Sequence, residues 1–260
     1  MTETIEFSIE GRVAYLTLNR PHVRNAFNAM MIEEVSAACR ELSTREDVTV
    51  LVLRGAGPTF SAGADAHWMH SSLALSREDN LADALRMSDM FAALNTLPQA
   101  VVAGVQGAAL GGGMGLLAAC DIVVATEDAI FGFTEAKLGI IPAVISRVVL
   151  AKIGPGWARS LYLSAEKFGS TPARAMGLVH WIVQEHKLDA AVDKRVRELC
   201  SSGPIAVRAA KRLIADLADL DDSGIRQITA ERIANLRVSP EGQEGLRAFL
   251  DKRRPSWRDV

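Results

Sequence analysis

Cysteine is scarce in this sequence, with three residues that lie far apart, Cys39, Cys120 and Cys200. Three separated thiols provide neither a disulfide framework nor a clustered metal site, so we expect a reducing, cytoplasmic compartment. The N-terminal residues also lack the basic and apolar regions of a secretory signal, which agrees with this expectation.

An excess of charge of one sign is missing as well. The chain has 29 Lys and Arg against 31 Asp and Glu, which gives a net charge of -2. Nucleic-acid surfaces normally show a strong excess of basic residues, so we expect small molecules or proteins as partners and no nucleic acid. With 49% hydrophobic residues among 260, the chain has enough apolar material for one large domain, with or without an appendage.

A single long uncharged stretch, residues 97–120, has the length of a membrane helix and contains the spacing Gly107 to Gly111. Pro98 at its start and six glycines between residues 104 and 115 interrupt it. We therefore expect a buried strand over 100–105, a glycine turn and a helix over 114–120, and no contact with a membrane.

Apolar periodicity predicts alternating strands and helices as far as residue 183. The expected strands cover residues 5–9, 13–18, 48–53, 100–105, 122–125, 129–133 and 179–183. Asn28 and Ser76 are expected to cap two helices, and a short third helix is framed by Pro172 and Gly177. In the helix after Ser76, the expected core residues are Leu81, Leu85, Met90 and Leu94.

Beyond residue 188 the pattern is helical only, with predicted helices over 191–199, 206–217, 225–236 and 241–250. We place a boundary near residue 200, with a core over 1–200 and a helical region over 201–260. The basic run 252–254 with Arg258 fits a solvated end or a contact with nucleic acid or phosphate groups, and short charge runs are most often solvated ends. Phe249 and Trp257 fit packing on a neighbouring subunit.

Two glycine-rich turns each follow an apolar strand, at residues 60–65 (Phe-Ser-Ala-Gly-Ala-Asp) and 107–113 (Gly-Ala-Ala-Leu-Gly-Gly-Gly). A lone glycine cluster often serves only to let a strand and a helix pack closely. Two such turns together can direct backbone N–H groups at one atom, and fixed amide donors stabilise developing negative charge. The pair therefore indicates an oxyanion site.

These turns, with residues 18–21 (Leu-Asn-Arg-Pro), 25–28 (Asn-Ala-Phe-Asn) and 131–142, resemble the enoyl-CoA hydratase/isomerase, or crotonase, superfamily in order and spacing. The resemblance covers nearly the whole chain. It implies an α/β fold, a spiral of repeated strand–strand–helix units with a C-terminal all-helical region that packs between subunits of a homotrimer or homohexamer. It also implies a CoA thioester substrate, with no separate cofactor and no metal.

The resemblance assigns the oxyanion hole to the backbone amides of Ala64 and Gly112, and the acid/base role to Glu135. Burial against neighbouring apolar residues is expected to raise the pKa of Glu135 toward the range needed for proton transfer. The other residues expected to bind the substrate or its CoA portion are Arg24, Ala26, Ala62, Gly63, Asp65, Ala66, Trp68, Gly111, Gly115, Thr134 and Pro142.

Gly115 departs from the family pattern, because the short-chain hydratases that resemble this chain carry a second glutamate there. One carboxylate can still deprotonate water and return the proton to C2, or carry a proton from C2 to C4. An enoyl-CoA hydratase and a 3,2-enoyl-CoA isomerase therefore both stay open. A non-catalytic acyl-CoA-binding protein is the alternative of another class.

Residues 63–69, 115–117 and 142–146 are similar to bacterial methylglutaconyl-CoA and isohexenylglutaconyl-CoA hydratases in particular. This similarity implies a 3-branched acyl group with a distal carboxylate, from leucine or acyclic-terpene breakdown. Arg147 and His67 are the candidate partners of that carboxylate. His67 and His70 have the spacing to share one helix face around a metal, but a third ligand is missing.

Overall fold

An antiparallel hairpin begins the larger of two sheets in the computed structural model, which describes residues 2–218 and 221–258. β1 (Ile5–Glu10) and β2 (Val13–Leu18) pair with Ile5 opposite Leu18. The remaining strands join in parallel in the order β1-β2-β3-β4-β6-β9, and they are β3 (Val50–Gly55), β4 (Ala100–Val105), β6 (Ile122–Thr126) and β9 (Trp181–Val183). The predicted strands are confirmed, with some ends shifted by one or two residues.

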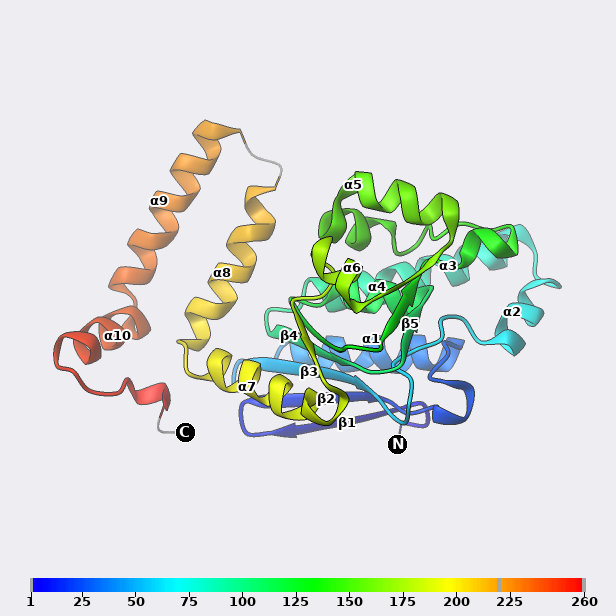
Figure 1. Ribbon diagram of the computed structural model, residues 1–260. Coiled ribbons are helices and arrows are strands. Elements are labelled where there is room, and N and C mark those ends of the chain that lie inside the picture. Colours follow the sequence, from blue (N-terminus) through cyan, green and yellow to red (C-terminus); the bar gives the residue numbers. More distant parts are fainter. Residues whose placement is uncertain (1, 219–220, 259–260) are drawn as a thin grey trace.

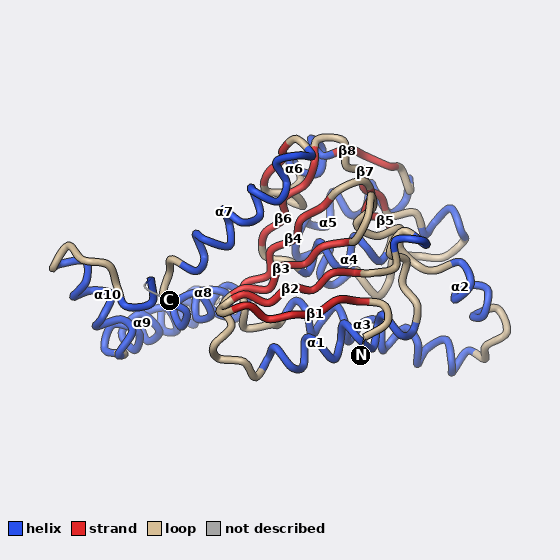
Figure 2. Tube along the Cα trace, turned by 90° about the horizontal axis from the view of Figure 1, so that it is seen from below, coloured by secondary structure: helices blue, strands red, loops and turns tan. Residues whose placement is uncertain are grey.

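The second sheet is small and has the order β5-β7-β8 (Figure 2). β5 (Ala108–Leu110) runs parallel to β7 (Ile130–Gly132), and β8 (Lys167–Gly169) runs antiparallel to β7. The sequence did not predict β5, because its three residues lie inside the glycine turn, nor did it predict β8.

Both faces of the large sheet are buried. Leu51, Leu53 and Val101 belong to the main core, which includes residues of α1 (Ala29–Ser43), α3 (Arg77–Asn95) and α4 (Gly112–Ala119). The alternate residues, such as Val50 and Val52, pack against α7 (Leu188–Cys200) on the other face. Parallel strands that are covered on both faces need continuous apolar runs, as the sequence has here.

A strand–strand–helix unit recurs along the chain. β4 is followed by β5 and α4, and β6 is followed by β7 and α5 (Ser146–Ser164). After β3, Ser61 forms an isolated parallel bridge to Ala109 of β5, so it takes the place of a second strand before α2 (Ala66–Ser72) and α3. The predicted α/β spiral of repeated units is confirmed.

Helix caps agree with the sequence where a cap was predicted. The side chain of Asn28 accepts from the Met31 amide, and that of Ser76 accepts from the Asp79 amide. In α3, Met90 and Leu94 are buried as expected, but Leu81 and Leu85 are 50% and 55% exposed. Their prediction as core was wrong, because in the first half of α3 other residues of the helix face the interior, where they line a cavity.

The long helix α5 was not predicted, because Gly154 and Pro155 interrupt its sequence pattern. Gly154 has a φ of 73° and a ψ of 164°, so the backbone kinks there between two helical halves. A shorter helix, α6 (Ser170–Ala175), lies where Pro172 indicated one.

The C-terminal region is helical, as predicted. α8 (Pro204–Leu217), α9 (Asp222–Val238) and α10 (Pro240–Leu250) extend away from the sheets (Figure 1). The domain division near residue 200 stays a prediction. Across the described residues, we find no helix with the length and apolar character needed to cross a membrane, and the uncharged stretch forms β4, β5 and α4.

Candidate active site

Three loops that follow neighbouring strands meet at one edge of the small sheet. Ser61, β5 and β7 are linked side by side in parallel, so their carboxyl ends point to the same edge. Ala64, Gly112 and Glu135 come two to three residues after these strands. Ligands commonly bind beyond the carboxyl ends of parallel strands in α/β folds. Here all three residues line one cavity of about 380 Å³.

The amides of Ala64 and Gly112 are free in the part of the chain that the structure describes, whereas several amides around them donate hydrogen bonds. Those of Ala62, Asp65 and Gly111 donate to the carbonyls of Arg24, Phe27 and Gly132 at 2.8 to 3.0 Å. Each free amide follows a glycine with positive φ, which is 92° at Gly63 and 49° at Gly111. These backbone conformations favour glycine and turn the next N–H away from the sheet.

The Gly112 amide also begins α4, so it has no acceptor within the helix. The dipole of a helix favours negative charge at this end. A substrate oxygen that develops negative charge near both amides would therefore be stabilised by two hydrogen bonds, and by α4 as well.

Main-chain hydrogen bonds hold the two turns against each other. The Ser61 amide donates to the Ala108 carbonyl and the Leu110 amide donates to the Ser61 carbonyl, both at 3.0 Å. The turns also pack closely, since a Cβ built on Gly63 would lie 3.0 Å from the Leu110 oxygen. The spacing of the two free amides is therefore set by the backbone and needs no side chain.

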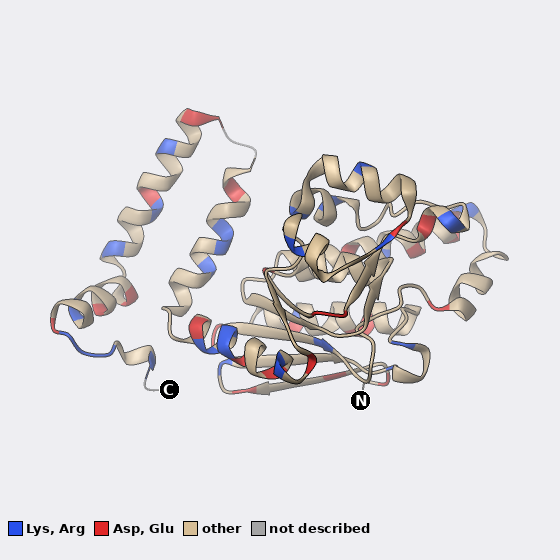
Figure 3. Cartoon of the chain, viewed as in Figure 1, with Lys and Arg blue, Asp and Glu red and all other residues tan. Residues whose placement is uncertain are grey.

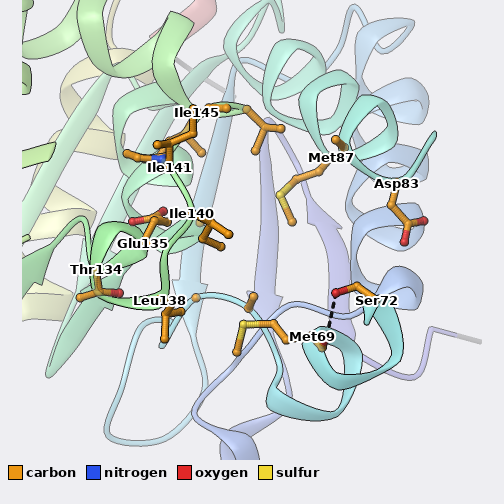
Figure 4. A pocket seen from close by; sticks show the side chains of 18 of the residues that line it. Met69, Ser72, Asp83, Met87, Thr134, Glu135, Leu138, Ile140, Ile141 and Ile145 are labelled. Atoms are coloured by element: carbon orange, nitrogen blue, oxygen red, sulfur yellow. Dashed lines mark hydrogen bonds between the residues drawn. The ribbon is translucent and has the colours of Figure 1, made fainter. Parts of the chain in front are cut away.

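Glu135 begins the 3-10 helix Glu135–Leu138 and points into the cavity (Figure 4). Its Oε1 lies beside the second turn, 3.4 Å from where a Cβ of Gly111 would be. Its Oε2 is buried, and the described residues offer it no hydrogen-bond partner. Burial raises the pKa of Glu135 above its ordinary value, while a hydrogen bond to its own backbone lowers it in part. A buried carboxylate oxygen left without a partner is typical of a functional group.

The rest of the cavity wall is mainly apolar. Thr134 and Pro142 flank Glu135, and Trp68 comes from α2, so the structure places these three predicted residues on the wall together with Ala62 and the two glycines that precede the free amides. Met69 adjoins Trp68 on the wall, and Leu138 and Ile141 are two of the apolar neighbours that the sequence expected around Glu135. The sequence did not indicate the other apolar lining residues, which are Ala84, Met87, Ile140, Ala143, Val144 and Ile145.

Three polar residues, Ser72, Asn80 and Asp83, also line the cavity and were missed. In α3 the signal was present, since Asn80, Asp83, Ala84 and Met87 recur at i, i+3, i+4 and i+7, which marks one face of a helix. The same spacing identifies the face of α3 that lines the cavity, and Leu81 and Leu85 do not belong to this face.

Asp65 was predicted to bind substrate, but it has a structural position. Its carboxylate accepts from the amides of His67 and Trp68 at the start of α2 and forms an ion pair of 2.8 Å with Arg20. Burial alone would raise the pKa of Asp65, but these hydrogen bonds lower it below its ordinary value. Asp65 therefore fixes the helix that carries Trp68 and Met69 to the cavity.

Three further predicted residues lie outside the cavity wall. Ala26 is buried and its carbonyl accepts from the Arg20 guanidinium at 2.6 Å, whereas Ala66 and Arg24 are exposed. The carbonyl of Arg24 accepts from the Ala62 amide, so this residue supports the first turn through its backbone. Among the described residues, the Arg24 side chain forms no hydrogen bond or ion pair with a residue that lines the cavity.

Gly115 does not line the cavity, which corrects its prediction as a binding residue. A Cβ at this position would lie 2.3 Å from Ile145 Cγ2 and 2.8 Å from the Phe91 ring. The space in which a side chain of residue 115 would lie is therefore filled by two apolar side chains, and Glu135 is the carboxylate that lines the cavity with the two free amides.

The three basic residues proposed for other roles also lie off the cavity wall. His67, His70 and Arg147 are exposed, and none is a lining residue. Over the described ranges, no group of three or more His, Cys, Asp or Glu is placed to hold a metal ion. His67 and His70 accordingly have no third ligand in the structure.

Known proteins resemble this chain over almost its whole length. The sequence model of the family described as enoyl-CoA hydratase/isomerase matches residues 8–260. The chain is similar to a crotonyl-CoA hydratase from Syntrophomonas wolfei, with 31% identity over 98% of each chain. It is also similar to a short-chain-enoyl-CoA hydratase from Clostridium acetobutylicum, with 30% identity over 94% of each. The crystal structure of an enoyl-CoA hydratase from Shewanella pealeana superposes with a TM-score of 0.94 and 38% identity, covering 98% of this chain and 96% of that one.

Proposed function

The chain belongs to the enoyl-CoA hydratase/isomerase family and is an enzyme of the enoyl-CoA hydratase type, and from this premise we propose that it adds water across the 2,3 double bond of an enoyl-CoA thioester, with Glu135 as the acid/base. The observation that carries the proposal is the meeting of two free amides and one buried, unpartnered carboxylate in the same cavity. Membership of an enzyme family argues against the non-catalytic acyl-CoA-binding alternative.

In the first step, ionised Glu135 takes a proton from water while the water oxygen bonds to C3. The electrons of the double bond move toward the thioester, whose oxygen gains the negative charge of an enolate. The amides of Ala64 and Gly112 stabilise that oxygen, at roughly 3–4 kcal/mol per donor. In the second step, Glu135 returns the proton to C2 and the thioester carbonyl reforms. The product is a 3-hydroxyacyl-CoA, and no further reactant is needed.

A 3,2-enoyl-CoA isomerase is the second candidate, because one carboxylate is sufficient for it. Glu135 would then take a proton from C2, which leaves a dienolate whose charge on the thioester oxygen the two amides stabilise, and return the proton to C4. The filled space at Gly115 supports this alternative, since Ile145 and Phe91 leave no room there for a second carboxylate to hold water.

The sequence resemblance implied a branched acyl group with a distal carboxylate, as in leucine or acyclic-terpene breakdown. The lining of the cavity favours a neutral acyl group instead. Its charged members among the described residues are Glu135 and Asp83, and it includes no Lys, Arg or His. A distal carboxylate would therefore enter this cavity without a cationic partner.

A homotrimer, or a hexamer of two trimers, is part of the proposal. The support is the apolar surface of the C-terminal helices, where Ile214, Phe249 and Leu250 are 75% or more exposed. A cytoplasmic location stays a prediction from the sequence.

Turnover by the purified protein tests the reaction. Crotonyl-CoA, 3-methylglutaconyl-CoA and a 3-enoyl-CoA are compared in ¹⁸O-labelled water, with the products identified by mass. Hydration gives a 3-hydroxy product that carries the label, whereas gain of conjugation from the 3-enoyl ester alone would make the chain an isomerase. Glu135→Gln is expected to lower turnover about a thousandfold while CoA-ester binding persists. Unchanged turnover would remove Glu135 from the mechanism.

The oxyanion hole is tested by Gly111→Ala, which places a side chain at a positive φ and beside Glu135. We expect kcat to fall about 10²- to 10³-fold, as for the loss of one such donor, with a smaller change in KM. Gly11→Ala is the matched control, because Gly11 has a φ of 56° in the β1–β2 turn and has no neighbour within 4 Å of its added Cβ. Gly11→Ala should lower the stability of the folded chain but leave kcat unchanged.

A further inference from the structure

Asp83 is a charged group in the cavity that the proposed reaction does not use. It comes from the first half of α3, and it lies across the cavity from Glu135 (Figure 4). A thioester whose carbonyl meets the amides beside Glu135 would extend its acyl group toward this opposite wall. The position of Asp83 therefore bears on which acyl groups can enter.

The neighbouring polar groups have no hydrogen left to donate. The side-chain amide of Asn80 donates to the carbonyls of Ser72, Leu75 and Ser76 at 3.0 to 3.3 Å, which ties down the loop between α2 and α3. The hydroxyl of Ser72 donates to the Met69 carbonyl at 2.7 Å. Since a serine hydroxyl has one hydrogen and a primary amide has two, this wall presents acceptors to an acyl chain.

The positive partner of Asp83 lies outside the cavity. Arg86, one turn along α3, forms an ion pair with Asp83, but its own side chain is 57% exposed and is not part of the cavity wall. The side chain of Asp83 is 17% exposed. Asp83 therefore places a negative charge at the cavity wall, while the compensating charge of Arg86 lies outside the cavity, where water and salt screen it.

We infer that Asp83 determines acyl specificity, and that it rejects acyl groups with a distal carboxylate in favour of neutral ones. This inference rests on the proposed hydration of enoyl-CoA esters at the same site. Beside Asp83, a distal carboxylate would meet a like charge and a row of acceptors, because Ser72 and Asn80 have no hydrogen left to replace its lost water. A neutral acyl chain would contact Met69, Met87 and Ile141, and it would lose no comparable hydration when it enters the cavity.

A pair of esters that differ only in the terminal group tests this inference, namely 2-hexenoyl-CoA and its counterpart with a terminal carboxylate. The wild-type protein should prefer the neutral ester by about tenfold or more in kcat/KM. Asp83→Asn keeps the size and removes the charge, so it should raise kcat/KM for the carboxylated ester about tenfold relative to that for the neutral ester. An unchanged ratio in Asp83→Asn would overturn the inference.

Arg86→Gln is the matched control on the same helix. If Asp83 repels the carboxylate, loss of its partner should leave or increase the preference for the neutral ester. A selective loss of activity toward the carboxylated ester in Arg86→Gln would mean that Arg86 attracts it, which would contradict the inference. In the unmodified protein, added salt should narrow the difference between the esters, because the effect is a screened charge repulsion.

Binding of the saturated esters, hexanoyl-CoA and adipoyl-CoA, separates this inference from the proposed reaction. We expect hexanoyl-CoA to bind more tightly than adipoyl-CoA, and this difference in affinity to disappear in Asp83→Asn. That result would support the role of Asp83 even if no enoyl ester turns over. Absence of turnover would then count against the hydration alone. Equal affinities in the wild-type protein would overturn the role of Asp83 even if hydration is fast.

Discussion

Glu135 combines two properties that are uncommon in a carboxylate with a purely structural role. It is buried enough to raise its pKa, and one of its oxygens has no partner among the described residues. An unpaired buried charge lowers the stability of the folded chain, so its retention agrees with a catalytic role.

The pH dependence of stability tests this view of Glu135. Its pKa is raised above 4.5 in the folded chain, so ionising the group costs the folded state more than the unfolded state. Below pH 4.5 the group is protonated in both states and the cost disappears. Glu135→Gln should therefore raise Tm relative to wild type at pH 8, and the gain should shrink to nothing near pH 4.

Calorimetry of both proteins over this pH range measures the effect. The same substitution at the exposed Glu127 serves as the control for removing one negative charge. A Tm difference that stays constant with pH would mean that Glu135 is not penalised when it ionises.

The residues of the reacting centre and those of the acyl wall differ in how far the sequence reveals them. The turns that contain Ala64 and Gly112 are visible as short glycine patterns, and the family resemblance assigned the individual amides and Glu135. Met87 and Asp83 line the cavity only because of the direction in which α3 crosses the sheet. That direction depends on packing between distant segments, although the spacing along α3 marks which face is shared.

At the scale of the elements, the packing of α4 depends on the glycine at position 115. Helix propensity alone favours alanine at Gly115 by about 1 kcal/mol, but an added Cβ would lie 2.3 Å from Ile145 Cγ2. We expect overpacking to dominate, so that Gly115→Ala destabilises the chain by about 1–3 kcal/mol in urea unfolding. The double variant Gly115→Ala with Ile145→Ala should lose less than the sum of the two single losses.

Gly156 provides a matched control in α5. It lies in a helix and is exposed, and a Cβ there would have no neighbour within 4 Å. Gly156→Ala should therefore stabilise the chain by about 0.5–1 kcal/mol. If Gly115→Ala behaved in the same way, the close packing of α4 against Ile145 and Phe91 would be wrong.

The elements that the sequence predicted well begin at a clear cap or end at a clear turn, as α1 does at Asn28 and α3 at Ser76. α5 was missed because its two halves are joined at Gly154 and Pro155, and each half alone is short. Its continuity comes from packing against α4 and the loop that follows Glu135, which no local pattern contains.

At the scale of the whole molecule, the C-terminal helices leave apolar surface exposed while charges of both signs are interspersed along them (Figure 3). A cavity of about 400 Å³ also lies between α8 and α9, with a wall that includes Leu213, Ile233 and Leu236. Monomers rarely expose contiguous apolar surface of this kind, which is why we expect self-association through α8 to α10.

Sedimentation of the full chain tests this expectation. The wild-type protein should sediment as a trimer or hexamer, and Phe249→Asp should shift it toward monomers, since Phe249 is 81% exposed on α10. Leu73→Asp is the control, because Leu73 is 82% exposed beside α2 at the other end of the molecule (Figure 1). A monomeric wild-type protein would contradict the expected assembly. The sequence predicted this helical region and its large apolar residues, but the direction in which the helices leave the sheets required the structure.

The two free amides have a consequence for inheritance. A single codon change can delete the carboxylate of Glu135, but the genetic code offers only proline as a way to delete an N–H group of the main chain. Most substitutions at Ala64 or Gly112 can disturb the position of an amide and still leave it in the polypeptide. Descendants of this gene can therefore exchange the acid/base residue, and with it the reaction, while they keep the ability to stabilise an enolate.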